Sequence, residues 1–172
     1  MSAYGGPADW WTQGTDVGRT HIATKGTIQN GLVLNLDAST NSSYPGTGTT
    51  WTDLSGSGNT GTLVNGPTYS TSDGGSIVFD GINDRIECGN FSVQYLSIST
   101  WVYKTSSATN QGICRKETGW AISQYNGTLQ VAPGTSWTFY NTNYTIPLNT
   151  WVNICLLYTS PSPRDRQKSR MP

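Results

Sequence analysis

Glu87 and Glu117 are the first candidates for catalytic chemistry, because a pair of carboxylates can supply the acid and the nucleophile of glycoside hydrolysis. Retaining hydrolysis needs two carboxyl groups about 5 Å apart. On a β-strand such a pair would be separated by two or four residues, since residues at that spacing share a face. Neither glutamate has an acidic neighbour at this spacing. The sequence therefore predicts that the protein is not an enzyme.

Asp80 and Asp84 form the tightest acidic cluster and lie at the end of a predicted strand. Calcium prefers carboxylate and carbonyl oxygens presented by a turn, so this pair is the candidate metal site, with Ca²⁺ as the cofactor that it would hold. The alternative is that Asp80 and Asn83 only close the turn through hydrogen bonds to the backbone.

The histidine and the cysteines do not indicate a zinc site. His21 is the only histidine, and Cys88, Cys114 and Cys155 form no Cys-x-x-Cys pair. We expect buried free thiols on strands. A disulfide between Cys88 and Cys114 is the alternative, which spacing alone cannot decide.

Aromatic rings can stack on the apolar faces of sugars and carry polar groups at their edges, which makes Trp and Tyr the natural glycan-binding side chains. Trp101 and Trp151 lie inside strand motifs and are predicted to be core residues. Four other rings lie near turn-rich segments and are the candidate ligand-binding residues: Trp120, Tyr125, Trp137 and Tyr140. Packing in the core or on a strand face is the alternative for each of them.

The charge distribution argues against nucleic acid as a partner. Before Cys155 the chain has six basic and nine acidic residues, which gives a net charge of −3, and its other four basic residues all lie in 164–170. The body thus lacks a basic stripe that could neutralise phosphates. No apolar run approaches the length of a membrane span, and no signal peptide is visible at the N-terminus.

The elements that must position these residues are predicted to be strands. Gly, Asn and Ser are frequent and favour turns over helices, and short runs of β-branched and aromatic residues alternate with Gly/Asn turns such as Asn126-Gly127. Residues 1–30 are expected to form an irregular leader or linker. The predicted strands are Leu32–Leu36, Thr62–Val64, Ser76–Asp80, Arg85–Cys88, Leu96–Tyr103, Gln111–Arg115, Trp120–Gln124, Leu129–Ala132, Trp137–Tyr140, Tyr144–Ile146 and a strand from Trp151 onward. This spacing indicates an all-β sandwich or barrel.

Seven short motifs occur in one order between Gly31 and Val152: Gly31–Ala38, Tyr44–Trp51, Asp53–Gly56 with Gly58-Asn59, Gly61–Leu63, Ser76–Gly81 with Asn83-Asp84, the strand Leu96–Val102 that ends in Ser99–Val102, and Asn149–Val152. In this order they resemble the laminin-G-like branch of the concanavalin A-like lectin/glucanase superfamily. The resemblance implies an antiparallel jelly-roll β-sandwich. It also implies the surroundings in which this branch is common, which are bacterial surface proteins and phage structural proteins.

Residues 155–172 resemble the translation of a transposon-type sequencing adapter. We therefore expect a partial laminin-G-like domain at 31–154 whose C-terminal strands are missing, an adapter-derived tail at 155–172, and a metagenomic source. Leu156, Leu157 and Tyr158 are apolar, so the strand from Trp151 is expected to extend to about Tyr158, and Pro161 and Pro163 to end regular pairing.

These observations predict a non-catalytic carbohydrate- or surface-binding module on a phage virion or a bacterial cell surface. Its partner would be a glycan or a cell-surface polysaccharide, together with other virion or surface subunits. Nucleic acid and membrane insertion are not expected. The alternative is a structural or assembly domain that contacts other proteins and binds no glycan.

Overall fold

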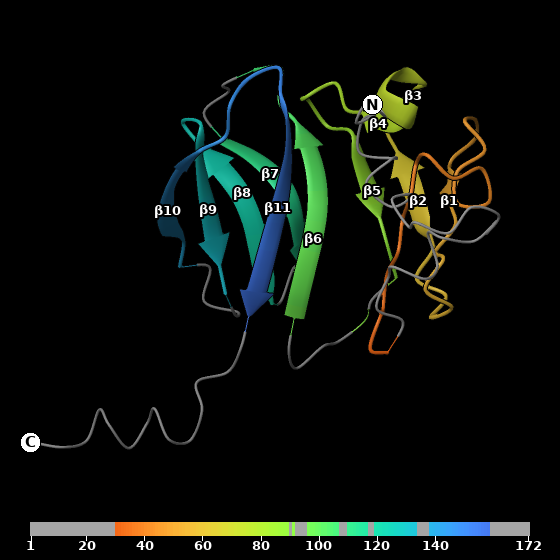
Figure 1. Cartoon of the computed structure of the whole chain (residues 1–172), viewed down its shortest axis with the longest axis horizontal. Helices are drawn as coiled ribbons and strands as arrows, with labels where there is room; N and C mark the ends of the chain where they lie inside the picture. The colour runs from red at the N-terminus through yellow and green to blue at the C-terminus, as the bar shows by residue number, and fades with distance from the viewer. Residues whose placement is uncertain are drawn as a thin grey trace, which may run out of the picture. The chain divides into compact units, whose positions relative to one another are not determined.

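The computed structural model describes residues 30–89, 91, 96–106, 110–116, 119–133 and 138–158. The predicted leader, apart from Asn30, and the tail beyond Tyr158 lie outside these residues. The chain divides into two compact units, Met1–Ser92 and Val93–Pro172, so the predicted domain 31–154 spans both units (Figure 1).

The described part of the chain is all-β with antiparallel sheets, as predicted. The only helical stretch found in it is the short 3-10 turn η2, Ser72–Gly74. No helix within the described ranges has the length and apolar character needed to cross a membrane.

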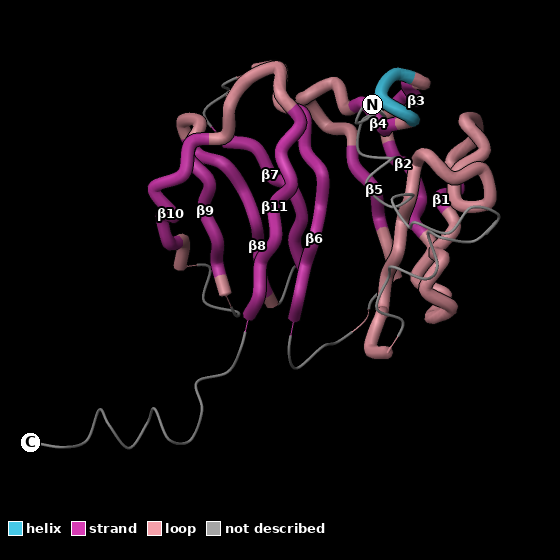
Figure 2. Tube along the Cα trace, viewed as in Figure 1, coloured by secondary structure: helices cyan, strands magenta, loops and turns pink. Residues whose placement is uncertain are grey.

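The described residues of the first unit lie mostly in loops between short strands (Figure 2). Its strands are β1 (Thr50–Trp51), β2 (Gly61–Val64), β3 (Thr68–Ser70), β4 (Ser76–Val78) and β5 (Arg85–Glu87). The order β1-β2-β5 forms a three-stranded sheet, and β3 pairs with β4. Gly61 allows close packing, since an added Cβ would lie 2.9 Å from Ile86 Cγ2 and 3.4 Å from Leu36 Cδ1.

The predicted strand Leu32–Leu36 is wrong, because this segment is not part of a ladder. Its backbone groups bond to a loop instead. The Asn35 N–H donates to Asp53 Oδ1 at 2.8 Å, and the Asn35 carbonyl accepts from the Leu54 N–H at 2.9 Å. The Val33 carbonyl accepts from Asn59 Nδ2 at 2.7 Å. Side-chain and backbone groups of the following loop thus satisfy backbone groups that a neighbouring strand would otherwise pair.

The described residues of the second unit form six strands: β6 (Leu96–Tyr103), β7 (Asn110–Lys116), β8 (Trp120–Tyr125), β9 (Thr128–Ala132), β10 (Tyr140–Thr145) and β11 (Trp151–Tyr158). β7 to β10 form a meander in the sheet order β10-β9-β8-β7, and β6 pairs with β11 in a two-stranded sheet. The register of this pair runs from Trp151 opposite Tyr103 to Tyr158 opposite Leu96.

One hydrophobic core joins the two sheets of the second unit. Three isoleucines are buried at its centre: Ile122 of β8, Ile146 directly after β10, and Ile154 of β11. The side chains that pack against them include Ile98, Val102, Leu129, Val131, Val152 and Leu156. The core therefore draws on the inner faces of both antiparallel sheets, an arrangement consistent with a β-sandwich.

Most strands of the second unit lie where the sequence predicts them. β6 matches at both ends, and β11 extends to Tyr158 as expected. The predicted pair Trp137–Tyr140 and Tyr144–Ile146 is replaced by the single strand β10, whose register shifts between Asn141 and Thr145. Asn143 adopts a φ of 60° there, a left-handed conformation that Asn tolerates and that suits a bulge.

Candidate ligand-binding face

The four-stranded sheet of the second unit has two chemically different faces. On β8, Ile122 and Gln124 are buried toward the core, and alternation turns Ala121, Ser123 and Tyr125 to the opposite side. The registers with β7, β9 and β10 extend this assignment across the sheet. The side away from the core carries one aromatic ring, one cation, and otherwise amides, hydroxyls and very short side chains.

We call this side the polar sheet face. Three rows of residues cross this face from β7 to β10. The first row contains Asn110, Tyr125, Thr128 and Thr145, and the second contains Gly112, Ser123, Gln130 and Asn141. The third contains Arg115, Ala121 and Ala132, without a paired β10 residue.

The middle of the polar sheet face is a low floor of short residues. Ala121, Ser123 and Ala132 are buried, and a Cβ added at Gly112 would meet nothing within 4 Å. Longer side chains rise around the floor. Among them, Asn110 and Arg115 are exposed. These buried residues are covered, so the open part of the face is at exposed Gly112 and Tyr125, with groups that form hydrogen bonds beside them.

Amide groups supply much of this rim. Gln130 Nε2 donates to Asn141 Oδ1 at 3.3 Å, which orients two neighbouring amides on β9 and β10. An amide offers both a donor and an acceptor, and Arg115 adds donors only. The rim could thus bind a polyhydroxylated ligand, whose hydroxyls both donate and accept.

The β8–β9 hairpin sets the position of the aromatic ring. Asn126 and Gly127 have φ values of 48° and 84°, the left-handed pair that a two-residue hairpin turn requires. This turn places Tyr125 opposite Thr128 at the end of the polar sheet face. The Tyr125 side chain is 47% exposed, so its ring is available to a ligand.

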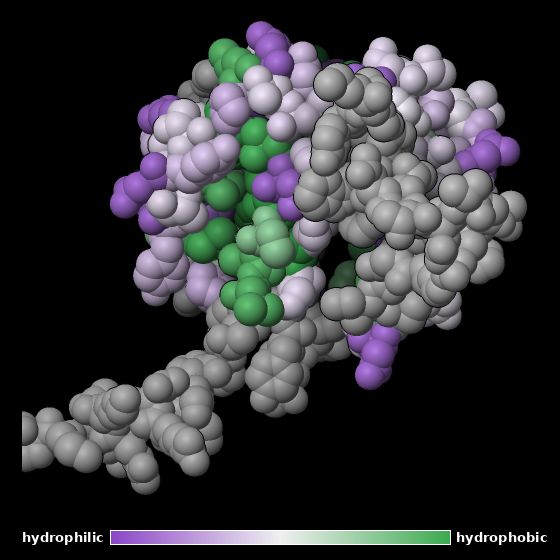
Figure 3. All heavy atoms as spheres, viewed as in Figure 1, coloured by the Kyte–Doolittle hydropathy of each residue, from purple (hydrophilic) through white to green (hydrophobic). Residues whose placement is uncertain are grey.

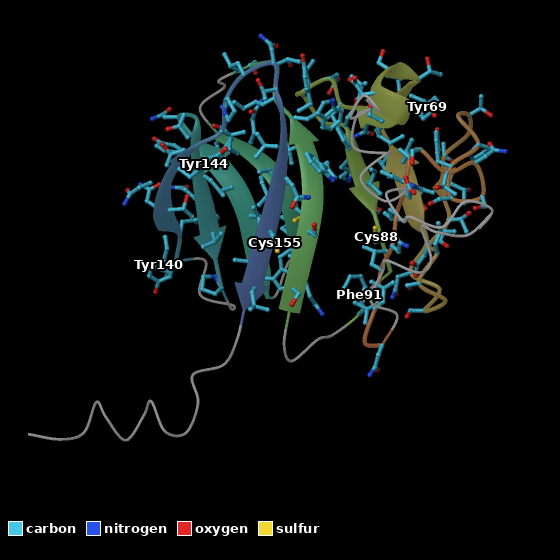
Figure 4. All side chains as sticks on the ribbon, in the orientation of Figure 1. Tyr69, Cys88, Phe91, Tyr140, Tyr144 and Cys155 are labelled. Carbon is cyan, nitrogen blue, oxygen red and sulfur yellow. The ribbon has the colours of Figure 1, made fainter. Side chains whose placement is uncertain are left out.

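The predicted ligand-binding rings do not form one platform. Tyr125 lies on the polar sheet face. Trp120 shares the alternation of Ile122, and Tyr140 lies opposite Val131, so both belong to the other side of the sheet. Tyr140, which Figure 4 shows on β10 with Tyr144, is 57% exposed. Trp137 lies outside the described residues.

Trp101 and Trp151 do not contribute to the core that the two sheets share, contrary to the prediction. They alternate with Val102 and Val152, which pack against that core, so the two indoles lie on the outer side of the β6–β11 sheet. Trp151 packs against Tyr103 with ring centroids 5.3 Å apart. Because this ring already has an aromatic partner, Tyr125 is the better candidate for stacking on a ligand.

Asp80 closes its turn in the way that the alternative interpretation describes. Its Oδ1 accepts the N–H groups of Ile82 at 2.8 Å, Asn83 at 3.3 Å and Asp84 at 3.4 Å. The Ile82 N–H contributes most to holding the pKa of Asp80 below its ordinary value. Asp84 Oδ2 accepts the Asp80 N–H at 2.9 Å. Among the described residues no group of three or more Asp, Glu, His or Cys could hold a metal ion, so calcium binding at Asp80 and Asp84 stays a prediction.

Sequence analysis missed Asn110, Arg115, Gln130 and Asn141, because polar residues of these types occur throughout the chain. Period-two alternation along the predicted strands could have placed Gln130 beside Ser123, but it does not reveal the bulge in β10 that brings Asn141 into the same row. The chain matches no protein-family model, no curated protein and no solved structure.

Proposed function

We propose that this chain is a non-catalytic carbohydrate-binding module and that it binds glycan on the polar sheet face. The observation that carries the proposal is the exposed Tyr125 ring on the same face as exposed Gly112 and the paired amides of Gln130 and Asn141. A sugar needs an apolar surface for its ring hydrogens and both donors and acceptors for its hydroxyls. The polar sheet face has both kinds of group.

Binding on this face would use an aromatic ring and amide groups, which contact the sugar without any chemical reaction. The Tyr125 ring would lie under the apolar face of one sugar, and the amides of Gln130 and Asn141 would exchange hydrogen bonds with hydroxyls of the next. The side chains assigned to this face include no carboxylate. This composition supports binding over hydrolysis, which would need an acid and a base or a nucleophile.

The resemblance to the laminin-G-like branch supports the same proposal from the sequence. With it we propose a jelly-roll topology and a place on a phage virion or a bacterial cell surface, where a module that binds polysaccharide would meet its ligand.

A glycan array probed with the 172-residue chain tests the proposal. We expect Tyr125→Ala to weaken binding of the best ligand by about tenfold or more, because an aromatic anchor carries a large share of the affinity. Tyr140→Ala is the matched control, since it removes an equally large exposed ring from the other side of the same sheet. An array without any binding, or equal effects of the two substitutions, would contradict the proposal.

A second candidate function, assembly with other subunits, is favoured by β11. This eight-residue strand pairs with β6, and no second neighbour appears in the described part of the chain. Its residues before the expected adapter-derived tail, Trp151–Ile154, have neither a charge nor a proline, and Asn153 is exposed. Figure 3 shows hydrophobic side chains gathered in the region of β11. An unprotected edge of this kind can pair with a strand of another chain.

Sedimentation velocity at increasing protein concentration tests the assembly function. We expect Asn153→Lys, which places a charge in the strand, to shift any oligomer toward the monomer. If the chain stays monomeric at all concentrations, both alone and mixed with other surface proteins, this result would contradict the assembly function.

A further inference from the structure

The turn between β8 and β9 is held from inside the protein. Gly127 is buried, although a hairpin turn ordinarily lies at the surface. Its N–H donates to Gln124 Oε1, and its carbonyl accepts the Ile146 N–H at 2.9 Å. A Cβ added to Gly127 would lie 3.6 Å from Lys104 Nζ and 3.7 Å from Thr145 Cγ2, both ordinary contact distances. Both backbone groups of this turn residue therefore have protein partners.

The Gln124 side chain, which accepts the first of these bonds, is only 1% exposed. Its Nε2 donates at 2.9 Å to Oε1 of Gln111, the residue opposite it on β7. Gln111 Nε2 donates in turn to Ser106 Oγ at 3.3 Å. Because the Gly127 N–H can only donate, it determines which way each of the two amides points. We call the linked residues Ser106, Gln111, Gln124 and Gly127 the amide series.

The amide series fixes the turn that follows Tyr125. Tyr125 comes directly after Gln124, so their side chains lie on opposite sides of β8. Asn126 and Gly127 connect Tyr125 to Thr128, its partner on β9. A turn that is held at Gly127 thus also holds the backbone from which the exposed Tyr125 ring projects.

Stability alone does not account for the two amides. Gln111 and Gln124 lie opposite one another on the side of the sheet that packs on the hydrophobic core. Burying amide groups is unfavourable unless hydrogen bonds replace those to water, and a pair of apolar side chains of the same shape can stabilise a core equally well. What the amides add is a defined geometry at the turn.

We propose that Gln124 is a positioning residue for glycan binding. Through the amide series it holds the Asn126-Gly127 turn in the geometry that presents the Tyr125 ring to the sugar. This proposal rests on the proposed function and explains how that site is pre-organised. Ordering a mobile anchor during binding lowers affinity, and a backbone that is fixed beforehand avoids this loss. Gln124 acts through Tyr125 and does not contact the glycan, since its side chain is buried on the core side of the sheet.

Gln124→Met tests the proposal, because methionine has a similar length and shape but replaces the amide with a weakly accepting sulfur. We expect this variant to bind the glycan with the strongest array signal about threefold to tenfold more weakly than the unaltered chain, measured by isothermal titration calorimetry. In a Tyr125→Ala background the same substitution should have little further effect, because Gln124 acts only through Tyr125. Gln124→Glu should retain most of the affinity, since its carboxyl oxygen can still accept the Gly127 N–H.

Amide hydrogen exchange followed by NMR examines the turn without any glycan. We expect the Gly127 amide to exchange about tenfold faster or more in Gln124→Met, while the ladder amides of β8 and β9 keep their protection. Ile154→Val is the stability control, because it removes a methylene group from the core of the same unit and leaves the bonds of the turn in place. It should bind the same glycan as tightly as the unaltered chain, and thermal unfolding confirms that each variant is folded.

The outcomes separate the two proposals. The positioning role is overturned by an unchanged exchange rate at Gly127, by an unchanged affinity of Gln124→Met, or by a loss of affinity that persists in the Tyr125→Ala background. An equal loss in Ile154→Val would reduce the effect to stability and overturn it as well. Each of these results leaves the proposed function standing. Absence of binding by the unaltered chain to every glycan on the array would overturn both.

Discussion

The Asp53 carboxylate accepts the backbone N–H of Asn59 at 2.9 Å, while the Asn59 side chain donates to the carbonyl of Val33 at 2.7 Å. Asp53 also accepts the Asn35 N–H at 2.8 Å, and the N–H and hydroxyl of Ser55 at 2.9 and 2.8 Å. This buried carboxylate therefore closes its own loop and fixes the extended segment that precedes it.

Replacing Asp53 with Ala should lower the free energy of unfolding by about 2–3 kcal/mol, because several donors would lose a charged acceptor in a buried place. Urea denaturation followed by circular dichroism measures this change. Asp37→Ala is the comparison. Asp37 bonds Ser39 and Thr40, but these bonds are more exposed, and we expect a smaller loss. Equal losses for the two variants would contradict the role given to Asp53.

Acid should destabilise the protein through the same carboxylate. Burial by itself would raise the pKa of Asp53, but the N–H groups of Ser55, Asn35 and Asn59 outweigh it and hold the pKa below its ordinary value of 3.8. The unfolded chain then binds the proton more readily, so this contribution is present above pH 3.8 and is lost as the pH falls through the folded pKa. Asp53→Asn should flatten this part of the stability profile, measured by urea denaturation at each pH. An unchanged slope would contradict the assignment.

The three thiols should differ in reactivity. All are free, but Cys155 is exposed, and burial raises the pKa of Cys114 to about 12 and raises that of Cys88. Because the thiolate is the reactive form, we expect iodoacetamide at pH 8 to label Cys155 first and Cys114 last. Peptide mass spectrometry over time reports the order. Rapid labelling of Cys114 in the folded protein would show that its strand is not packed as described.

Calcium should leave the thermal stability unchanged if Asp80 serves only to close its turn. Its Oδ1 already accepts backbone N–H groups, which a cation would have to displace. A thermal melt in 1–10 mM CaCl₂, with MgCl₂ as the control, decides between the two interpretations of this cluster. A rise in melting temperature that Asp84→Asn abolishes would establish the metal site instead.

The sequence predicts the second unit better than the first, for a physical reason. Strands such as β6 and β8 alternate in hydrophobicity because one face of each packs on a core. The dipeptide Asn126-Gly127 predicts the hairpin turn between β8 and β9. Leu32–Leu36 alternates in the same way but pairs with loop groups, which no periodicity can reveal. The short strands β1 and β3 were not predicted, because two or three residues carry no period.

The candidate site was predictable only in part. Tyr125 could be found from its ring and its place before a turn. That Trp120 and Tyr140 lie on the other side of the sheet depends on register, and the register of β10 depends on a bulge at Asn143.

The nesting of the strands in the second unit has a consequence for how this unit folds. β7 to β10 pair with sequence neighbours, whereas β6 and β11 enclose the whole meander between them and must close a loop of nearly fifty residues. The entropy of that closure must be overcome before the long pair gains any hydrogen bond, so the meander should form first and β11 should dock last. Pulsed hydrogen exchange during refolding would then protect the amides of β8 and β9 before those of β11. A chain emerging from the ribosome would meet the same order, because the meander is synthesised before β11.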